Sequence, residues 1–249
     1  KAKKVGGTQW ADEAHFFCEA PRANRADDPV IPPTQLFDNV YAIGNSGTTV
    51  YVFKTSAGLL MFDSLADNQR DSQLLPGFQK LGLNPADVKL IVMGHGHGDH
   101  FGGSPYFQKT YGSKVYIGEP DWPAVLNPPA AKKGPAVEGP KRDGDVKEGE
   151  PIVLGDFKMT PYSIPGHTPG SVGFIFKVTD NGQPHMAAMF GGTILGTGRI
   201  PTEGLRQYQR SIDHFLEMAK RMGVDVEIQN HAMFDDTPGR LARVQARKA

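Results

Sequence analysis

Four side chains able to bind a metal ion fall within six residues, in the segment Gly94-His95-Gly96-His97-Gly98-Asp99-His100. His95 and His97 are two residues apart, so an extended backbone directs both side chains to one side. The glycines lack a Cβ atom and let the backbone turn tightly around a shared centre. A single His-x-His is weak evidence, because isolated histidines are usually polar surface residues. Imidazole and carboxylate groups together are ligands that zinc prefers, so the segment predicts a metal site.

Two further histidines stand directly after β-rich runs, where functional sites gather. His167 lies within the segment 164–171, and His231 follows the run Val226 to Asn230. Six ligands divided into two triplets would hold two metal ions, and such a pair can activate water at neutral pH. This arrangement is typical of hydrolases. The remaining histidines have polar contexts typical of surface or packing roles: His15, His185 and His214.

The elements that must position these residues form two blocks. The first block predicts strands at 40–43, 49–53 and 59–62, a helix at 67–81 that Pro76 interrupts, a strand at 88–93, a helix at 99–111 and a strand at 114–117. A Gly/Pro-rich segment at 127–150 favours a long surface loop. The second block predicts strands at 151–154, 157–164, 171–178 and 186–190, a helix at 203–222, a strand at 224–228 and a helix at 238–247. Two strand-and-helix blocks predict two packed sheets with outer helices.

Length and composition favour one domain that binds a small molecule. Residues 1–35 are polar and proline-rich, which predicts an irregular N-terminal arm before a single domain at 36–249. The chain carries 27 basic and 27 acidic side chains, so no net field attracts nucleic acid or a membrane surface. No apolar run is long enough to span a bilayer. We expect a small-molecule substrate, no nucleic-acid or membrane partner, and a monomer.

The chain starts at Lys1 and contains a single cysteine, Cys18, so it forms no intrachain disulfide. A start without Met fits either an expressed fragment or a mature chain whose signal peptide has been removed. On the second reading we expect a periplasmic or secreted protein.

The motif His-x-His-x-Asp-His, the later Pro-Gly-His and the strand-end His231 resemble the metallo-β-lactamase superfamily, from about Leu36 to Val244. The resemblance implies an α/β fold, a four-layer αββα sandwich of two mixed β-sheets with helices on the outer faces. It also implies two Zn²⁺ ions. The implied ligands are His95, His97 and His167 for the first zinc, and Asp99, His100 and His231 for the second. Asp63 matches a family acid that supports the site from behind; its alternative role is a turn cap.

One departure from the family pattern indicates which subfamily the sequence resembles. Many dinuclear members carry a bridging Asp in the segment that here reads Phe190-Gly191-Gly192-Thr193, and Gly192 cannot bridge. Cys18 is far from the segment where the first subclass carries its cysteine ligand, and His95 occupies the position where the second subclass has Asn. The sequence therefore resembles the third subclass of metallo-β-lactamases.

This resemblance implies a zinc-dependent hydrolase that opens a cyclic amide, a β-lactam, by attack of a metal-bound hydroxide. Asp99 would then orient the hydroxide and relay its proton to the leaving nitrogen. Ser171 is a candidate substrate contact, or else simply the residue that opens a strand. A lactone or ester hydrolase of the same superfamily is the alternative within enzymes. A metal-dependent redox protein and a non-catalytic binding module remain open.

Overall fold

The computed structural model describes residues 28–128, 137–193 and 201–248. Its strands form two sheets, one of seven strands and one of five. The first sheet has the order β1 (Val30–Phe37), β2 (Val40–Asn45), β3 (Thr49–Thr55), β4 (Gly58–Phe62), β5 (Val88–Val92), β6 (Lys114–Gly118), β7 (Gly144–Val146). The second has the order β12 (Val226–Ile228), β11 (Gln183–Phe190), β10 (Val172–Asp180), β9 (Phe157–Ser163), β8 (Ile152–Leu154). Both sheets contain parallel and antiparallel pairs, so both are mixed.

The two sheets pack face to face through aromatic side chains. Side chains alternate across a strand, so β3 directs Phe53 into the core between the sheets and Val52 into the core under the helices. Phe53 stacks on Phe157 of the other sheet with ring centroids 4.6 Å apart, and Phe62 meets Phe174 edge to face at 5.3 Å. Continuous apolar runs such as 50–53 arise because both faces of this sheet are covered.

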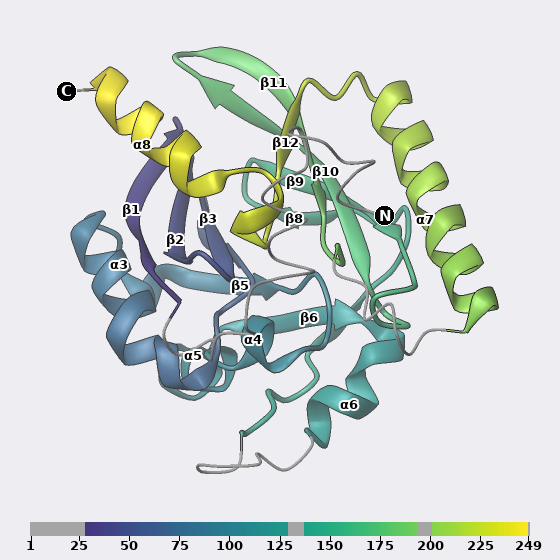
Figure 1. Cartoon of the computed structure of the whole chain (residues 1–249). Coiled ribbons are helices and arrows are strands. Elements are labelled where there is room, and N and C mark those ends of the chain that lie inside the picture. Colours follow the sequence, from purple (N-terminus) through teal and green to yellow (C-terminus); the bar gives the residue numbers. More distant parts are fainter. Residues whose placement is uncertain (1–27, 129–136, 194–200, 249) are drawn as a thin grey trace.

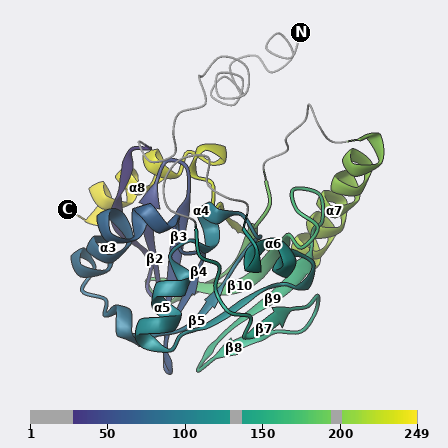
Figure 2. The same cartoon turned by 90° about the horizontal axis from the view of Figure 1, so that it is seen from below.

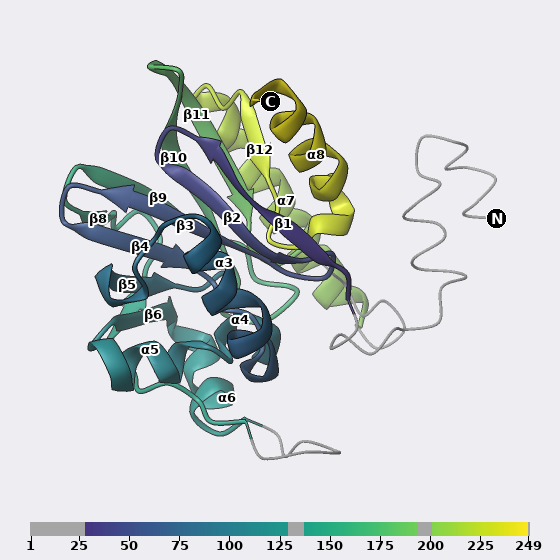
Figure 3. The ribbon, with the colours of Figure 1, turned by 90° about the vertical axis from the view of Figure 1, so that its left-hand side faces the viewer.

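Helices cover the outer faces of both sheets (Figure 1). The seven-stranded sheet is covered by α3 (Leu75–Lys80), α4 (Gly98–Phe101), α5 (Ser104–Tyr111) and α6 (Trp122–Leu126), and α7 (Thr202–Arg221) covers the five-stranded sheet. Figure 2 shows α3, α4 and α5 on one side of the paired sheets and α7 on the other. The last helix, α8 (Thr237–Lys248), runs beside β1 (Figure 3), and its Leu241 enters the core between the sheets. The predicted αββα sandwich is confirmed.

The N-terminal arm was predicted to extend to residue 35, and this boundary is wrong. Strand β1 begins at Val30, and its Ile31 is buried. Prolines lack a backbone donor and are tolerated in edge strands, and the β1–β2 register shifts between Ile31 and Thr34, around Pro32-Pro33. The rest of the arm, residues 1–27 with Cys18, lies outside the described residues, and the single-domain boundary stays a prediction.

Two predicted helices are divided in the structure. The segment 67–81 is a 3₁₀ turn, a π turn and then α3, which has Pro76 in its first turn. The segment 99–111 is divided into α4 and α5 by Gly102-Gly103. A Cβ atom on Gly103 would lie 2.3 Å from the carbonyl oxygen of Ser64, so only glycine fits there.

The predicted surface loop at 127–150 is partly wrong. Gly144–Val146 forms β7 and pairs in parallel with β6 at the edge of the larger sheet. Its sequence Gly-Asp-Val has no β-rich pattern, so the neighbouring strand decides its conformation. Residues 129–136 of this segment lie outside the described residues. No helix among the described residues has the length and apolar character needed to cross a bilayer.

Candidate metal centre

Three loops from both sheets bring the predicted ligands together. His95 and His97 follow β5, and Asp99 and His100 lie in the first turns of α4. His167 lies between β9 and β10 of the other sheet, and His231 follows β12. The amide of Val172 donates to the carbonyl of Gly94 at 2.9 Å, which joins the first two loops.

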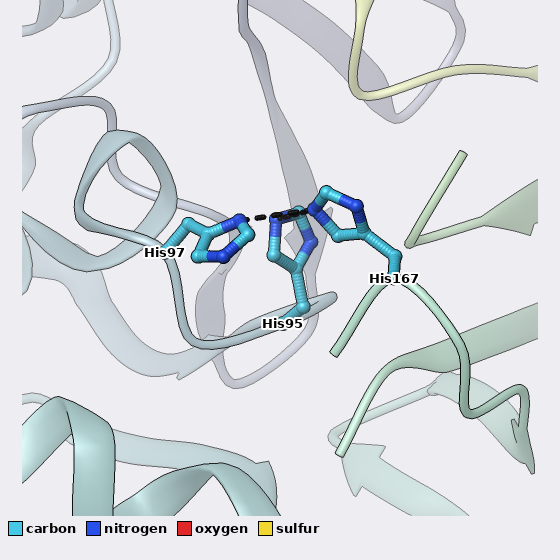
Figure 4. A group of neighbouring side chains, drawn as sticks. All are labelled: His95, His97 and His167. Carbon is cyan, nitrogen blue, oxygen red and sulfur yellow. Dashed lines mark hydrogen bonds between the residues drawn. The ribbon is translucent and has the colours of Figure 1, made fainter. Parts of the chain in front are cut away.

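The first triplet directs three ring nitrogens at one point (Figure 4). His167 Nε2 lies 2.9 Å from His95 Nε2 and 3.0 Å from His97 Nδ1. Unprotonated nitrogens this close repel each other unless a proton or a cation lies between them. His95 is buried while His97 is exposed, so the group is reached from solvent on one side. The three nitrogens have the donor chemistry and proximity that a zinc ion requires.

Backbone carbonyl groups orient two of the rings. His95 Nδ1 donates to the carbonyl oxygen of Gly191 at 2.6 Å, and His231 Nδ1 donates to that of Gly47 at 2.7 Å. A carbonyl only accepts, so each Nδ1 carries the proton and each Nε2 is left as the ligand atom. Neither carbonyl group was singled out from the sequence.

His100 joins the second group, with His95 and His231. Its Nδ1 lies 2.7 Å from Asp63 Oδ2. Its buried Nε2 has no hydrogen-bond partner and lies 3.4 Å from Asp99 Oδ2. Burial would lower the pKa of His100, but the carboxylates of Asp63 and Asp99 outweigh it and raise this pKa to about 10. Burial and the neighbouring His100 depress the pKa of His95. A buried nitrogen without a hydrogen bond, close to a carboxylate, is an arrangement that a cation bound by both groups would fit.

Asp63 lies behind the histidine cluster, where the family resemblance implied a supporting acid. Its carboxylate accepts from the Gly94 amide at 3.0 Å and from Asn230 Nδ2 at 3.0 Å, besides its contact with His100. It is buried and has a φ of 59°. The carboxylate therefore ties two ligand loops together and fixes the His100 ring.

Thr48 is a neighbour of Asp99, a contact that the sequence did not predict. Its Oγ1 donates to Asp99 Oδ2 at 3.2 Å from the turn that also presents the Gly47 carbonyl. The next residue, Thr49, is buried and its Oγ1 has no hydrogen-bond partner. The Thr48 hydroxyl therefore has a partner, Asp99, whereas the Thr49 hydroxyl has none, and substitutions can test this difference.

Replacing Thr48 by valine is expected to lower the kcat/KM of the zinc-loaded protein about two- to tenfold, because it removes one hydrogen bond to Asp99. Thr49→Val is the matched control and should leave kcat/KM unchanged, since it removes an unsatisfied buried hydroxyl. Steady-state kinetics and thermal unfolding of both variants check this. Equal kcat/KM in the two variants would show that Thr48 does not act on Asp99.

Ser171 lies under the His167 loop. Its side chain is 1% exposed, and its Oγ accepts from the Thr168 amide at 3.0 Å and lies 2.8 Å from Thr168 Oγ1. The predicted substrate contact stays a prediction, and this burial disfavours it. A second carboxylate absent from the sequence-based site, Asp121, accepts from Thr168 Oγ1 at 2.6 Å.

Gly192 has a packing reason to lack a side chain. A Cβ atom there would lie 2.7 Å from Ser171 Oγ and 3.2 Å from the Cβ of His167. An aspartate at this position would collide with the loop that carries His167.

Away from the centre, His185 pairs with Asp225 and His214 with Glu148, each at 2.7 Å, in surface roles as predicted. His15 lies outside the described residues.

The family profile described as "Metallo-beta-lactamase superfamily" matches residues 43–180, more than half of the chain. The chain belongs to the metallo-β-lactamase superfamily. The crystal structure of BJP-1, a subclass B3 metallo-β-lactamase of Bradyrhizobium japonicum, has a TM-score of 0.74 and 30% identity, covering 84% of this chain and 80% of that chain. Native FEZ-1 metallo-β-lactamase from Legionella gormanii has a TM-score of 0.75 and 21% identity, covering 88% and 86%. The predicted resemblance to the third subclass is confirmed at the level of structural neighbours.

Curated relatives in this superfamily have varied names. Hydroxyacylglutathione hydrolase GloC of Haemophilus influenzae is 28% identical over 41% of this chain and 50% of its own length. Lactamase-like protein aptB of Emericella nidulans is 22% identical over 78% of this chain and 54% of its own. The chain spans less than two thirds of the curated relatives that it matches, from 32% to 64% of their lengths. Membership therefore establishes a metallo-hydrolase fold, and the substrate is a matter for proposal.

Proposed function

We propose that the protein is a zinc-dependent hydrolase that opens the cyclic amide of a β-lactam. The observation that carries the proposal is the five histidines and Asp99 gathered at one edge of the paired sheets, with Gly192 where a bridging aspartate would stand. The similarity to a subclass B3 enzyme at 30% identity supports the β-lactam over other substrates. Zinc bound there would lower the pKa of water to about 7 and polarise the substrate carbonyl.

Hydrogen bonds at the ring nitrogens indicate which atom of each residue faces the metal. The first ion would be held by three nitrogens that face one another, Nε2 of His95 and His167 and Nδ1 of His97. The second would be held by Asp99 together with the Nε2 atoms of His100 and His231, whose Nδ1 atoms contact Asp63 and the Gly47 carbonyl. The other ring nitrogens of three of these histidines have defined partners: His95 Nδ1 the Gly191 carbonyl, His100 Nδ1 the Asp63 carboxylate, and His231 Nδ1 the Gly47 carbonyl.

Asp99 has the position of the proton carrier. Its Oδ2 accepts from Thr48 and faces His100, and its side chain is only 10% exposed, so its orientation is fixed and little water competes for it. As the C–O bond forms and the amide C–N bond breaks, Asp99 would accept the proton of the attacking water and return it to the leaving nitrogen. The buried rear of the site, closed by Asp63 and Asn230, would keep the centre rigid.

A lactone, ester or thioester hydrolase is the second candidate, favoured by the similarity to hydroxyacylglutathione hydrolase GloC. The same residues would then deliver the proton to an oxygen or sulfur leaving group. For either activity we propose a small-molecule substrate, a monomer and a periplasmic or secreted location.

Turnover and metal content measured on one sample test the proposal. We expect a chelator to abolish hydrolysis of a chromogenic cephalosporin, and two equivalents of zinc to restore it, because water at this centre is activated only by bound metal. Homoserine lactone and a hydroxyacyl thioester are measured beside it. Two bound zinc ions without cephalosporin turnover would contradict the β-lactam assignment, and stoichiometric iron or no metal would contradict the zinc assignment.

A further inference from the structure

Asp121 lies behind the first triplet at the point where its two loops meet. It ends the turn that follows β6, and its side chain is 3% exposed. Oδ2 accepts from the Gly96 amide at 2.7 Å, between the two histidines of the first loop. The same atom accepts from Thr168 Oγ1 at 2.6 Å, and Oδ1 accepts from the Gly170 amide at 2.8 Å, both in the loop of His167.

The ordinary structural role of an aspartate at this place is absent. Asp121 occupies the N-cap of α6, yet its side chain makes no capping hydrogen bond to that helix. A capping aspartate normally accepts from the first free amides of its own helix. This carboxylate is instead committed to the two histidine loops.

Each of the two loops has a glycine where its backbone approaches Asp121 closely. A Cβ atom on Gly96 would lie 2.9 Å from Asp121 Cβ, and one on Gly170 would lie 2.7 Å from Asp121 Cγ. The glycine between His95 and His97 is therefore required by a neighbour far along the chain, beyond any need for a tight turn.

We propose that Asp121 is a positioning residue that sets the separation of the His95–His97 loop from the His167 loop and thereby the zinc affinity of the first site. The two loops belong to different sheets, so their separation depends on contacts across the sheet interface. Hydrogen bonds to a buried carboxylate are short and strong, which lets one side chain fix both backbones. The inference rests on the proposed zinc centre and not on the identity of the substrate.

Zinc affinity of purified protein, measured by competition with a chromophoric chelator, tests the inference. Asp121→Asn keeps the size of the side chain but places an N–H group against one of the backbone amides. It is expected to weaken the first site about 10–100-fold, the range found when residues supporting metal ligands are replaced. The visible absorption of the cobalt-loaded protein should change with it, because it reports the ligand geometry that a purely structural role would leave alone.

Asp143→Asn is the matched control. Asp143 also accepts a backbone amide, that of Val115 at 3.0 Å, but at the opposite end of β6 from Asp121. The Asp143→Asn variant should retain the zinc affinity of the parental protein. Thr168→Val removes the hydroxyl that donates to Asp121 and also contacts Ser171 Oγ, and it leaves the Asp121 carboxylate and its two backbone hydrogen bonds in place. It should weaken the first site less than Asp121→Asn does, and it decides the matter if Asp121→Asn does not fold.

The outcomes separate this inference from the proposed function. Parental zinc affinity in Thr168→Val, with Asp121→Asn either unchanged or unfolded, overturns the positioning role. A parental protein that binds no zinc overturns the proposed zinc centre itself. Zinc loss in Asp121→Asn with an unchanged unfolding temperature of the metal-free protein supports the positioning role.

Discussion

Replacing Asp99 by alanine is expected to lower kcat/KM of the zinc-loaded protein about 10²–10⁴-fold, the usual contribution of a general acid or base. Asp99 Oδ2 lies between the Thr48 hydroxyl and His100 Nε2, so its removal takes away both the proposed proton carrier and a proposed ligand. Zinc content should fall from two equivalents toward one. Kinetics on a chromogenic cephalosporin and metal analysis of the same sample measure both effects.

Two variants make this prediction specific. Asp99→Asn keeps an oxygen ligand but cannot carry the proton, so it should lose more activity than zinc. Asp71→Ala is the control, because Asp71 is 70% exposed and pairs with Arg70 on the surface. Full turnover with two bound zinc ions in Asp99→Ala would remove Asp99 from the mechanism and from the ligand set.

Replacing Asp63 by asparagine is expected to lower the unfolding free energy of the metal-free protein by about 3–5 kcal/mol, because it removes one partner of a buried ion pair. Asp63 and His100 are both fully buried, and Asp63 together with Asp99 keeps the pKa of His100 at about 10. The affinity of the second zinc site should fall about 10–100-fold, since the His100 ring loses its support. Denaturant unfolding and chelator competition measure the two effects.

The backbone conformation at Asp63 supplies a matched control. Asp63 has a φ of 59°, which asparagine adopts as readily as aspartate, so the substitution isolates the charge. Asp236 has a φ of 54° but is exposed and pairs with Arg243 on the surface. Asp236→Asn should therefore change neither stability nor zinc affinity appreciably. A similar small effect at both positions would show that the buried pair contributes little.

The candidate ligands of the segment 94–100 were identifiable from the sequence because their signal is local in the chain. The segment 94–100 carries its ligands and its glycines within a single turn, and the apolar runs that deliver it have a strand pattern. The two-sheet architecture was predictable for the same reason, since runs such as 49–53 record burial on both faces.

The edge elements were not predictable in this way. β1 contains Pro32-Pro33 and β7 reads Gly-Asp-Val, and neither has a composition typical of a strand. Their conformation comes from pairing with β2 and β6, which satisfies backbone groups whatever the side chains are. The division of the helix at 99–111 likewise depends on the backbone of Ser64, which lies close to Gly103.

By itself, the sequence determined which side chains are candidate ligands, how many there are, and their family resemblance. Only the tertiary structure decided which groups orient them: the carbonyls of Gly47 and Gly191, the hydroxyl of Thr48 and the carboxylate of Asp121. The physical reason is that every residue has a backbone carbonyl, and threonine and aspartate are common, so residue type carries no sign of such a role. The role arises only when folding brings that one acceptor or donor, from a distant part of the chain, to within hydrogen-bonding distance of the site.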